Sequence, residues 1–241
     1  MTASHRCVGP FEVDIMDFPA PDLRHPLRPG RFAVWRYDGT QPVAAVPAPS
    51  AAAVQVLHQV AGEPWPSPLS GYVHAAPLGE LPLDDLLGLL AHLPEPPDTP
   101  RWQHLATTTP TYWYRLLQPW VCLAILHHAD HEPWATSTRR QVLVDLAFGV
   151  EDWVSDSALF ALVTAAYRQP ETRSEVRRLV RSRLDAAASA DRLVTIEESL
   201  ARLTLVTPGC DADDKDAARK TLAPTADETP TDKRRWWRRR K

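Results

Sequence analysis

The feature that most constrains the fold of this chain is a proline that recurs every 37 residues. Pro96, Pro133 and Pro170 are spaced by 37 residues, and Pro208 follows after 38. Each proline comes just after an apolar run with helical spacing, as in "LLGLLAHLPEP" and "LFALVTAAYRQP". Because proline disrupts the interior of a helix, each one marks a turn at the same point of a repeated unit. The unit is therefore predicted to be a helix, a turn and a second helix.

The same shift of 37 residues superposes the apolar positions of successive units. The aligned sets are Leu86, Leu123 and Phe160; Leu89, Leu126 and Val163; Arg140 and Arg177; Val142 and Leu179; and Leu143 and Val180. Self-similarity at a period in this range is typical of an α-solenoid, in which stacked units bury one another's apolar faces. The alternative is an irregular helical bundle whose similar helices are separated by prolines.

The stretch "HEPWATSTRRQVLVDLAFG" resembles the middle of a HEAT-type repeat, where a turn containing Asp or Pro leads to an arginine near the start of the second helix, followed by spaced aliphatic residues. The matching residues are Pro133, Arg139, Arg140, Val142, Leu143 and Leu146, and then Pro170, Arg173, Arg177, Leu179 and Val180. The resemblance covers roughly residues 81–206, and the period lies slightly below the usual 40–47 residues of that family. It implies a scaffold or binding module, although some HEAT-like proteins bind nucleic acids and a few are enzymes.

Residues 1–80 have a mixed, turn-rich character. "FEVDIMDF" alternates like a strand, and "RFAVWRYDGTQPVAAV" predicts a hairpin through Asp38-Gly39. Ser50 is placed to cap a short helix over "AAAVQVLHQVA", and "GYVHAA" is a further candidate strand. We therefore expect a small sheet with a helix against it.

The chain after Thr207 loses the helical periodicity. "PGCDADDKDAARKTLAPTADETPTD" is polar and holds few large apolar residues, which favours a disordered linker. The predicted fold is thus mostly α. It comprises a small α+β region (1–80), a domain of HEAT-like stacked helical pairs (81–206), and a disordered linker with a basic tail (207–241).

The tail is the most strongly charged segment of the sequence. Residues 1–232 hold 20 of the 27 basic residues and all 30 acidic ones, a net charge of −10, whereas the last nine residues add +7. Those nine are candidates for binding a polyanion: Lys233, Arg234, Arg235, Trp236, Trp237, Arg238, Arg239, Arg240 and Lys241. The tryptophans suit stacking on unpaired bases or a lipid headgroup boundary. Docking on the chain's own acidic body and a terminus without a target remain alternatives.

A second charged feature lies on a predicted helix, "ETRSEVRRLVRSRLD". Arg177, Arg178 and Arg181 flank its apolar stripe on the exposed side. Guanidinium groups match carboxylates and phosphates in geometry, so these three residues form a candidate patch for an acidic partner. A solvated arginine face is the alternative.

Catalytic and metal-binding signals are sparse. No complete catalytic motif is found, and Cys7, Cys122 and Cys210 are too scattered for a disulfide framework or a zinc site. In "HHADHE", His127 and His131 are four residues apart, and His128 lies four residues before Glu132. This spacing suits a metal, but it also suits histidines at a helix C-terminus. No metal ligands and no cofactor are assigned.

These observations favour a non-enzymatic interaction module that binds a protein partner, with the tail adding electrostatic attachment. A nucleic-acid-associated or anionic-membrane-associated protein that binds through the tail is the alternative. A third hypothesis is an enzyme with a site between residues 1–80 and the helices, involving His104, His127 or His131. Neither a signal peptide nor a long apolar span is evident, so we expect a cytoplasmic protein.

Overall fold

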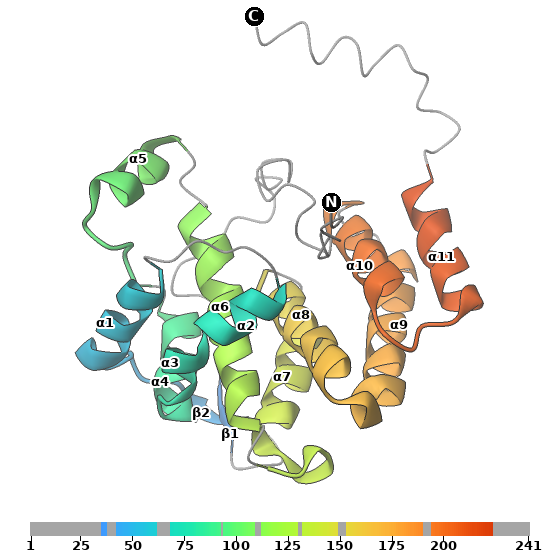
Figure 1. Cartoon of the computed structure of the whole chain (residues 1–241), viewed down its shortest axis with the longest axis horizontal. Helices are drawn as coiled ribbons and strands as arrows, with labels where there is room; N and C mark the ends of the chain where they lie inside the picture. The colour runs from blue at the N-terminus through green and yellow to red at the C-terminus, as the bar shows by residue number, and fades with distance from the viewer. Residues whose placement is uncertain are drawn as a thin grey trace, which may run out of the picture.

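The computed structural model describes residues 35–37, 42–61, 68–92, 94–108, 112–129, 132–148, 153–189 and 194–223. Within these residues the chain is mostly helical (Figure 1). The elements are β1 (Trp35–Tyr37), β2 (Pro42–Ala45), α1 (Ala51–Val60), α2 (Pro68–His74), α3 (Ala76–Gly79), α4 (Leu83–Ala91), α5 (Pro100–Thr108), α6 (Tyr112–Ala129), η1 (Trp134–Thr136), α7 (Thr138–Phe148), α8 (Trp153–Arg168), η2 (Pro170–Thr172), α9 (Arg173–Ser189), α10 (Val194–Val206) and α11 (Ala212–Leu222).

The predicted succession of helix, proline-marked turn and helix is confirmed. The pairs are α4–α5, α6–α7, α8–α9 and α10–α11, and we call α4, α6, α8 and α10 the first helices and α5, α7, α9 and α11 the second helices. Pro133 precedes η1, Pro170 begins η2, and Pro208 is followed by Gly209 with φ of 89°. Glycine adopts this left-handed conformation at little cost, so the last turn uses Gly209 where the turns after α6 and α8 use a short 3-10 helix.

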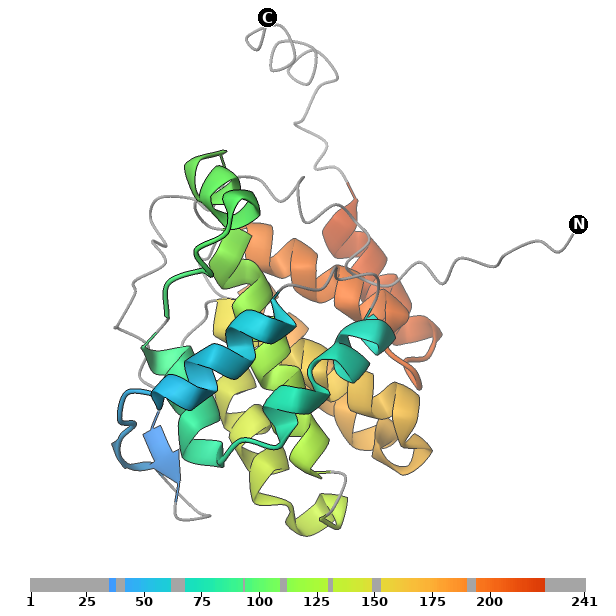
Figure 2. The ribbon, with the colours of Figure 1, turned by 60° about the vertical axis from the view of Figure 1, so that its left-hand side comes forward.

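Successive pairs pack against one another from left to right in Figure 1. Helix α6 packs along α8, and each second helix also contacts the first helix of the next pair, α7 on α8 and α9 on α10. In Figure 2 the N-terminal helices α2 and α3 lie across the near side of α6, which they also contact. This arrangement buries α6 and α8 from several sides, and it is compatible with a helical repeat.

Most of the apolar positions that recur every 37 residues are buried in the core of the structure. Leu86, Leu123 and Phe160 have exposed fractions of 1% or less. Leu89, Leu126, Val163, Leu143 and Val180 are also buried. Burial of such side chains is the main favourable term in folding, so the repeated sequence pattern corresponds to a repeated contribution to stability.

The first pair departs most from the pattern, because α5 is shorter than α7, α9 and α11. Helix α5 contacts α6 and projects from the body at the upper left of Figure 1. Its anchor is Trp102, whose ring meets that of Trp113 edge to face with centroids 5.0 Å apart. Trp113 in turn donates its indole N–H to the carbonyl of Pro94 at 2.6 Å. Both tryptophans are buried, as expected for core residues.

Ahead of the pairs, β1 and β2 form an antiparallel two-stranded sheet with Trp35 opposite Ala45. Ser50 caps α1, because its hydroxyl accepts a hydrogen bond from the Ala53 amide at 3.2 Å. The same hydroxyl donates to Asp85 of α4 at 3.0 Å, so one cap also joins two helices. The strand predicted over "FEVDIMDF" lies outside the described residues.

The prediction of a strand over "GYVHAA" is wrong, because these residues belong to α2 and the start of α3. Tyr72, Ala75 and Leu78 are buried, whereas Val73 is 66% exposed. The buried residues are three apart, which is the spacing of one helix face. The valine that suggested a strand faces away from the core.

The predicted disordered linker is also wrong over its first part, since residues 207–223 contain the turn at Gly209 and the helix α11. Asp211 and Asp214 form a reciprocal capping box at its start, which satisfies two orphan backbone donors. Ala218 is fully buried. The absence of large apolar residues suggested disorder, but a buried alanine and a capping box support this helix instead.

Candidate functional site: charged junctions between the second helices

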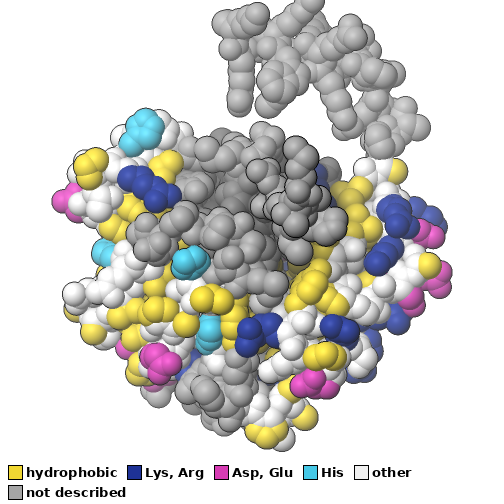
Figure 3. Space-filling view, in the orientation of Figure 1, with side chains coloured by type: hydrophobic (Ala, Val, Ile, Leu, Met, Phe, Trp, Pro, Cys, Tyr) yellow, Lys and Arg dark blue, Asp and Glu magenta, His cyan; other side chains and the backbone are white. Residues whose placement is uncertain are grey.

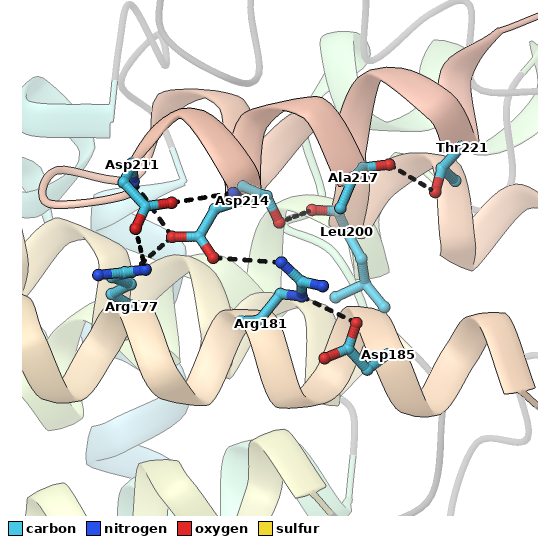
Figure 4. Close-up of polar contacts among 9 residues, drawn as sticks. Arg177, Arg181, Asp185, Leu200, Asp211, Asp214, Ala217 and Thr221 are labelled. Atoms are coloured by element: carbon cyan, nitrogen blue, oxygen red, sulfur yellow. Dashed lines mark hydrogen bonds and ion pairs between the residues drawn. The ribbon is translucent and has the colours of Figure 1, made fainter.

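The arginines predicted as an acidic-partner patch lie on α9, and two of them contact α11 (Figure 4). Arg177 forms ion pairs with both Asp211 and Asp214. Arg181 donates to Asp214 at 3.3 Å and to Asp185, one turn further along α9, at 2.8 Å. The chain therefore supplies acidic partners of its own to this surface.

Asp214 is the centre of this junction. Only 4% of its side chain is exposed. Burial by itself would raise the pKa of Asp214, but hydrogen bonds from Arg177, the Asp211 amide and Arg181 lower it below the ordinary carboxyl value. The hydrogen bond to Asp214 likewise raises the pKa of Arg177. Asp214 is thus held as a carboxylate, and each of its oxygens meets an arginine.

An equivalent junction joins α7 to α9. Arg140 forms an ion pair with Glu175, which also accepts a hydrogen bond from the Trp134 indole at 2.6 Å. The guanidinium carbon of Arg140 lies 6.0 Å from the Trp134 ring centroid, within reach of a cation–π contact. Burial opposes the charge on Glu175, but Arg140 and Trp134 outweigh it and lower its pKa.

The two junctions follow one pattern. Arg140 and Arg177 are 37 residues apart, and each contacts an acid in the first turn of the next second helix. Sequence reasoning identified Arg177 and Arg181 and missed their partners Asp211 and Asp214. A signal for them existed in the aspartates of "CDADDKD", where Asp211 and Asp214 have the spacing of a capping box.

Arg178, the third arginine of the predicted patch, is exposed. The side of α11 at the right of Figure 3 shows basic and acidic side chains intermixed. Phe148, at the end of α7, is 40% exposed. Arg178 and Phe148 are thus outward-facing side chains on neighbouring second helices.

His127 belongs to a stacked group near the C-terminal ends of α6 and α8. Its ring lies 3.7 Å from the Tyr72 ring in a parallel stack, and its Nε2 is hydrogen-bonded to the Tyr72 carbonyl. The Arg168 guanidinium lies 3.9 Å from the centroid of the Tyr72 ring. The stack therefore fastens α2 to α6 and α8. Because Tyr72 is only 3% exposed, the Tyr72 ring is hardly accessible to a ligand.

The histidines considered for an enzyme site do not come together. His104 is exposed on α5, which is anchored near Trp113, and His127 lies fourteen residues further along α6. At 1.5 Å per residue, Trp113 and His127 are roughly 20 Å apart along the helix axis. His131 and the side chain of His128 lie outside the described part of the chain. Among the residues that are described, no group of three His, Cys, Asp or Glu residues could hold a metal.

Two polar side chains, Gln118 of α6 and Arg139 of α7, are buried in the core. Gln118 is fully buried, and neither atom of its amide has a hydrogen-bond partner. Arg139 is 3% exposed, its Nη1 has no partner, and burial lowers its pKa to about 10. Leaving a buried donor unsatisfied costs stability, so both residues are weak points of the core.

The cysteines are also placed apart. Cys122 is fully buried in α6, and Cys210 is 9% exposed in the turn before α11. Burial and the nearby Asp214 raise the pKa of the Cys210 thiol to about 11. A thiol with so high a pKa is a poor nucleophile near neutral pH.

The tail residues 233–241 lie outside the described residues, so their binding role stays a prediction. Within the described ranges, no helix combines the length and the apolar character that crossing a bilayer requires. No protein-family model, curated protein or solved structure matches the chain.

Proposed function

We propose that the chain is a HEAT-like repeat module that binds another protein and performs no chemistry of its own. The observation that carries the proposal is the outward side of the second helices, where Phe148 and Arg178 are exposed on neighbouring helices. Aromatic residues and arginine are enriched in protein interfaces and among the residues that dominate binding energy.

The charged junctions support this use of the surface. Glu175 is fixed by Arg140, and Arg177 and Arg181 are fixed by the aspartates of α11. Side chains held in place lose less conformational entropy when a partner binds. The exposed Arg178 therefore lies beside a preorganised set of charges.

Affinity purification of the tagged full chain from its own cells tests the proposal. We expect a protein to be recovered in stoichiometric amount, and Phe148→Ser or Arg178→Glu to reduce its recovery about tenfold, a change of about 1.4 kcal/mol. Val73→Ser is the matched control, since Val73 is 66% exposed on α2, away from this surface. Equal recovery by all variants, or no recovered protein, would refute the proposal.

The tail supports a second candidate function, polyanion attachment, through its charge of +7 over nine residues. Binding of a single-stranded oligonucleotide or of anionic vesicles should fall steeply with salt and be lost when residues 233–241 are removed. The loss of only one of these activities would identify the polyanion. Binding that persists without the tail would contradict this role.

A further inference from the structure

Helix α11 is attached to the body with little apolar burial. Of its described side chains only Asp214 and Ala218 are buried, whereas α7, of the same length, buries five. Helix α11 packs along α10, and its attachment to α9 is made by the ion pairs of Arg177 and Arg181. Elements with few buried apolar contacts open at the lowest cost in free energy, so α11 is more easily released than α7.

The charge pattern of the repeat also ends at α11. Position 140 is arginine and position 177 is arginine, but position 214, a further 37 residues along, is aspartate. The pattern in which each arginine contacts an acid in the next second helix therefore stops here. Asp214 accepts from the preceding arginines, and α11 has no arginine at this position to continue the series.

From this geometry we propose that the Arg177–Arg181 surface of α9 is a docking site for the acidic first turn of a helix. In the structure α11 fills the site, and a partner helix of the same chemistry takes it when α11 is released. The required chemistry is two carboxylates three residues apart at the N-terminal end of a helix, as in Asp211 and Asp214. This inference rests on the proposed function, because it names the partner of the same second-helix surface.

Release of α11 can be measured through Cys210, which is buried at the junction. In the full chain carrying Cys7→Ser, alkylation of Cys210 is followed by mass spectrometry, with the fully buried Cys122 as the internal reference. Asp214→Asn keeps an acceptor for the helix cap but removes the charge, and it should speed alkylation about tenfold or more. Asp213→Asn, an exposed aspartate on the same turn, makes the same charge change and should leave the rate unaltered.

Binding is then tested with a fluorescent peptide of residues 209–223 added to the Asp214→Asn chain. We expect it to bind about tenfold more tightly than to the wild-type chain, and to lose binding when the peptide carries Asn at 211 and 214 or when the protein carries Arg177→Gln. Circular dichroism establishes that each variant is folded. If Asp214→Asn does not fold, Asp211→Asn replaces it, because Asp211 is exposed and forms the other ion pair with Arg177.

Each outcome decides the matter. Equal Cys210 alkylation in Asp213→Asn and in the variant at Asp214 or Asp211 would overturn the release of α11. Faster alkylation without peptide binding would overturn the docking site, as would an oligonucleotide that binds this surface where the peptide does not. The peptide result is independent of whether a protein is recovered from cells, so the failure of this inference and that of the proposed function are distinguishable.

Discussion

Replacing Arg139 with methionine should stabilise the protein, although it removes an arginine that the HEAT-like pattern contains. Arg139 is 3% exposed, its Nη1 has no hydrogen-bond partner, and burial lowers its pKa to about 10. The folded state thus pays for a desolvated charge without a compensating contact. Methionine keeps the length of the apolar stem and removes the polar head, a replacement that is often neutral or stabilising in cores.

The size of the effect follows from the cost of an unsatisfied buried donor, about 1 to 3 kcal/mol. A gain of about 2 kcal/mol corresponds to about 4 to 8 °C in Tm for a chain of this size. Thermal unfolding followed by far-ultraviolet circular dichroism measures the shift directly, and urea unfolding gives the free energy independently.

Arg140→Met is the matched control, because the two arginines are adjacent and differ in their contacts. Arg140 pairs with Glu175 and lies over Trp134, so its loss leaves a half-buried carboxylate without its cation and should lower Tm. An unchanged or lower Tm for Arg139→Met would refute the reasoning, since it would mean that the guanidinium of Arg139 is stabilising where it lies.

Three further predictions follow from the packing. Attachment of α11 should weaken in acid: the pKa of Asp214 is lowered in the folded state, so its contribution is fully present above the ordinary carboxyl pKa and lost as the pH falls through the folded-state value. At that acidic pH, the rate of Cys210 alkylation, measured relative to the unfolded chain, should rise in the wild-type protein and should rise less in Asp214→Asn. Gly88→Ala should cost about 1 to 3 kcal/mol by overpacking, because a Cβ at Gly88 would lie 2.9 Å from the Pro47 carbonyl oxygen; urea unfolding checks this, and a neutral result would contradict it. Leu123→Ala should cost about 2 to 5 kcal/mol in the same assay, since Leu123 is fully buried at a repeated core position.

The helix pairs could be predicted from the sequence because two independent signals coincide in them. The apolar residues have helical spacing, and the prolines mark the turns at a constant interval. Errors arose where one of the signals is missing. In α2 a valine and a tyrosine in succession suggest a strand, and only the burial of Tyr72 with Ala75 and Leu78 reveals the helix face. In α11 the buried face consists of Ala218 and a paired aspartate.

The basic half of the candidate site could be predicted from the sequence, and the acidic half could not. Arg177 and Arg181 stand out in a single helix, because their neighbours on one side are apolar. Their partners Asp211 and Asp214 lie more than thirty residues away in sequence, and no local pattern links a basic helix to an acidic turn at that distance. Only the packing of α9 beside α11 shows that the charges are satisfied within the chain.

The different chemistry of the two helix layers has a mechanical consequence. Helices α6 and α8 are joined by buried apolar side chains, which resist separation because interiors are close-packed and hardly compressible. The second helices are joined by ion pairs at Arg140 and Arg177, whose strength depends on the ionic strength of the medium. A stack with one stiff side and one compliant side bends about the stiff side, so the curvature of this molecule is expected to respond to salt while its core stays intact.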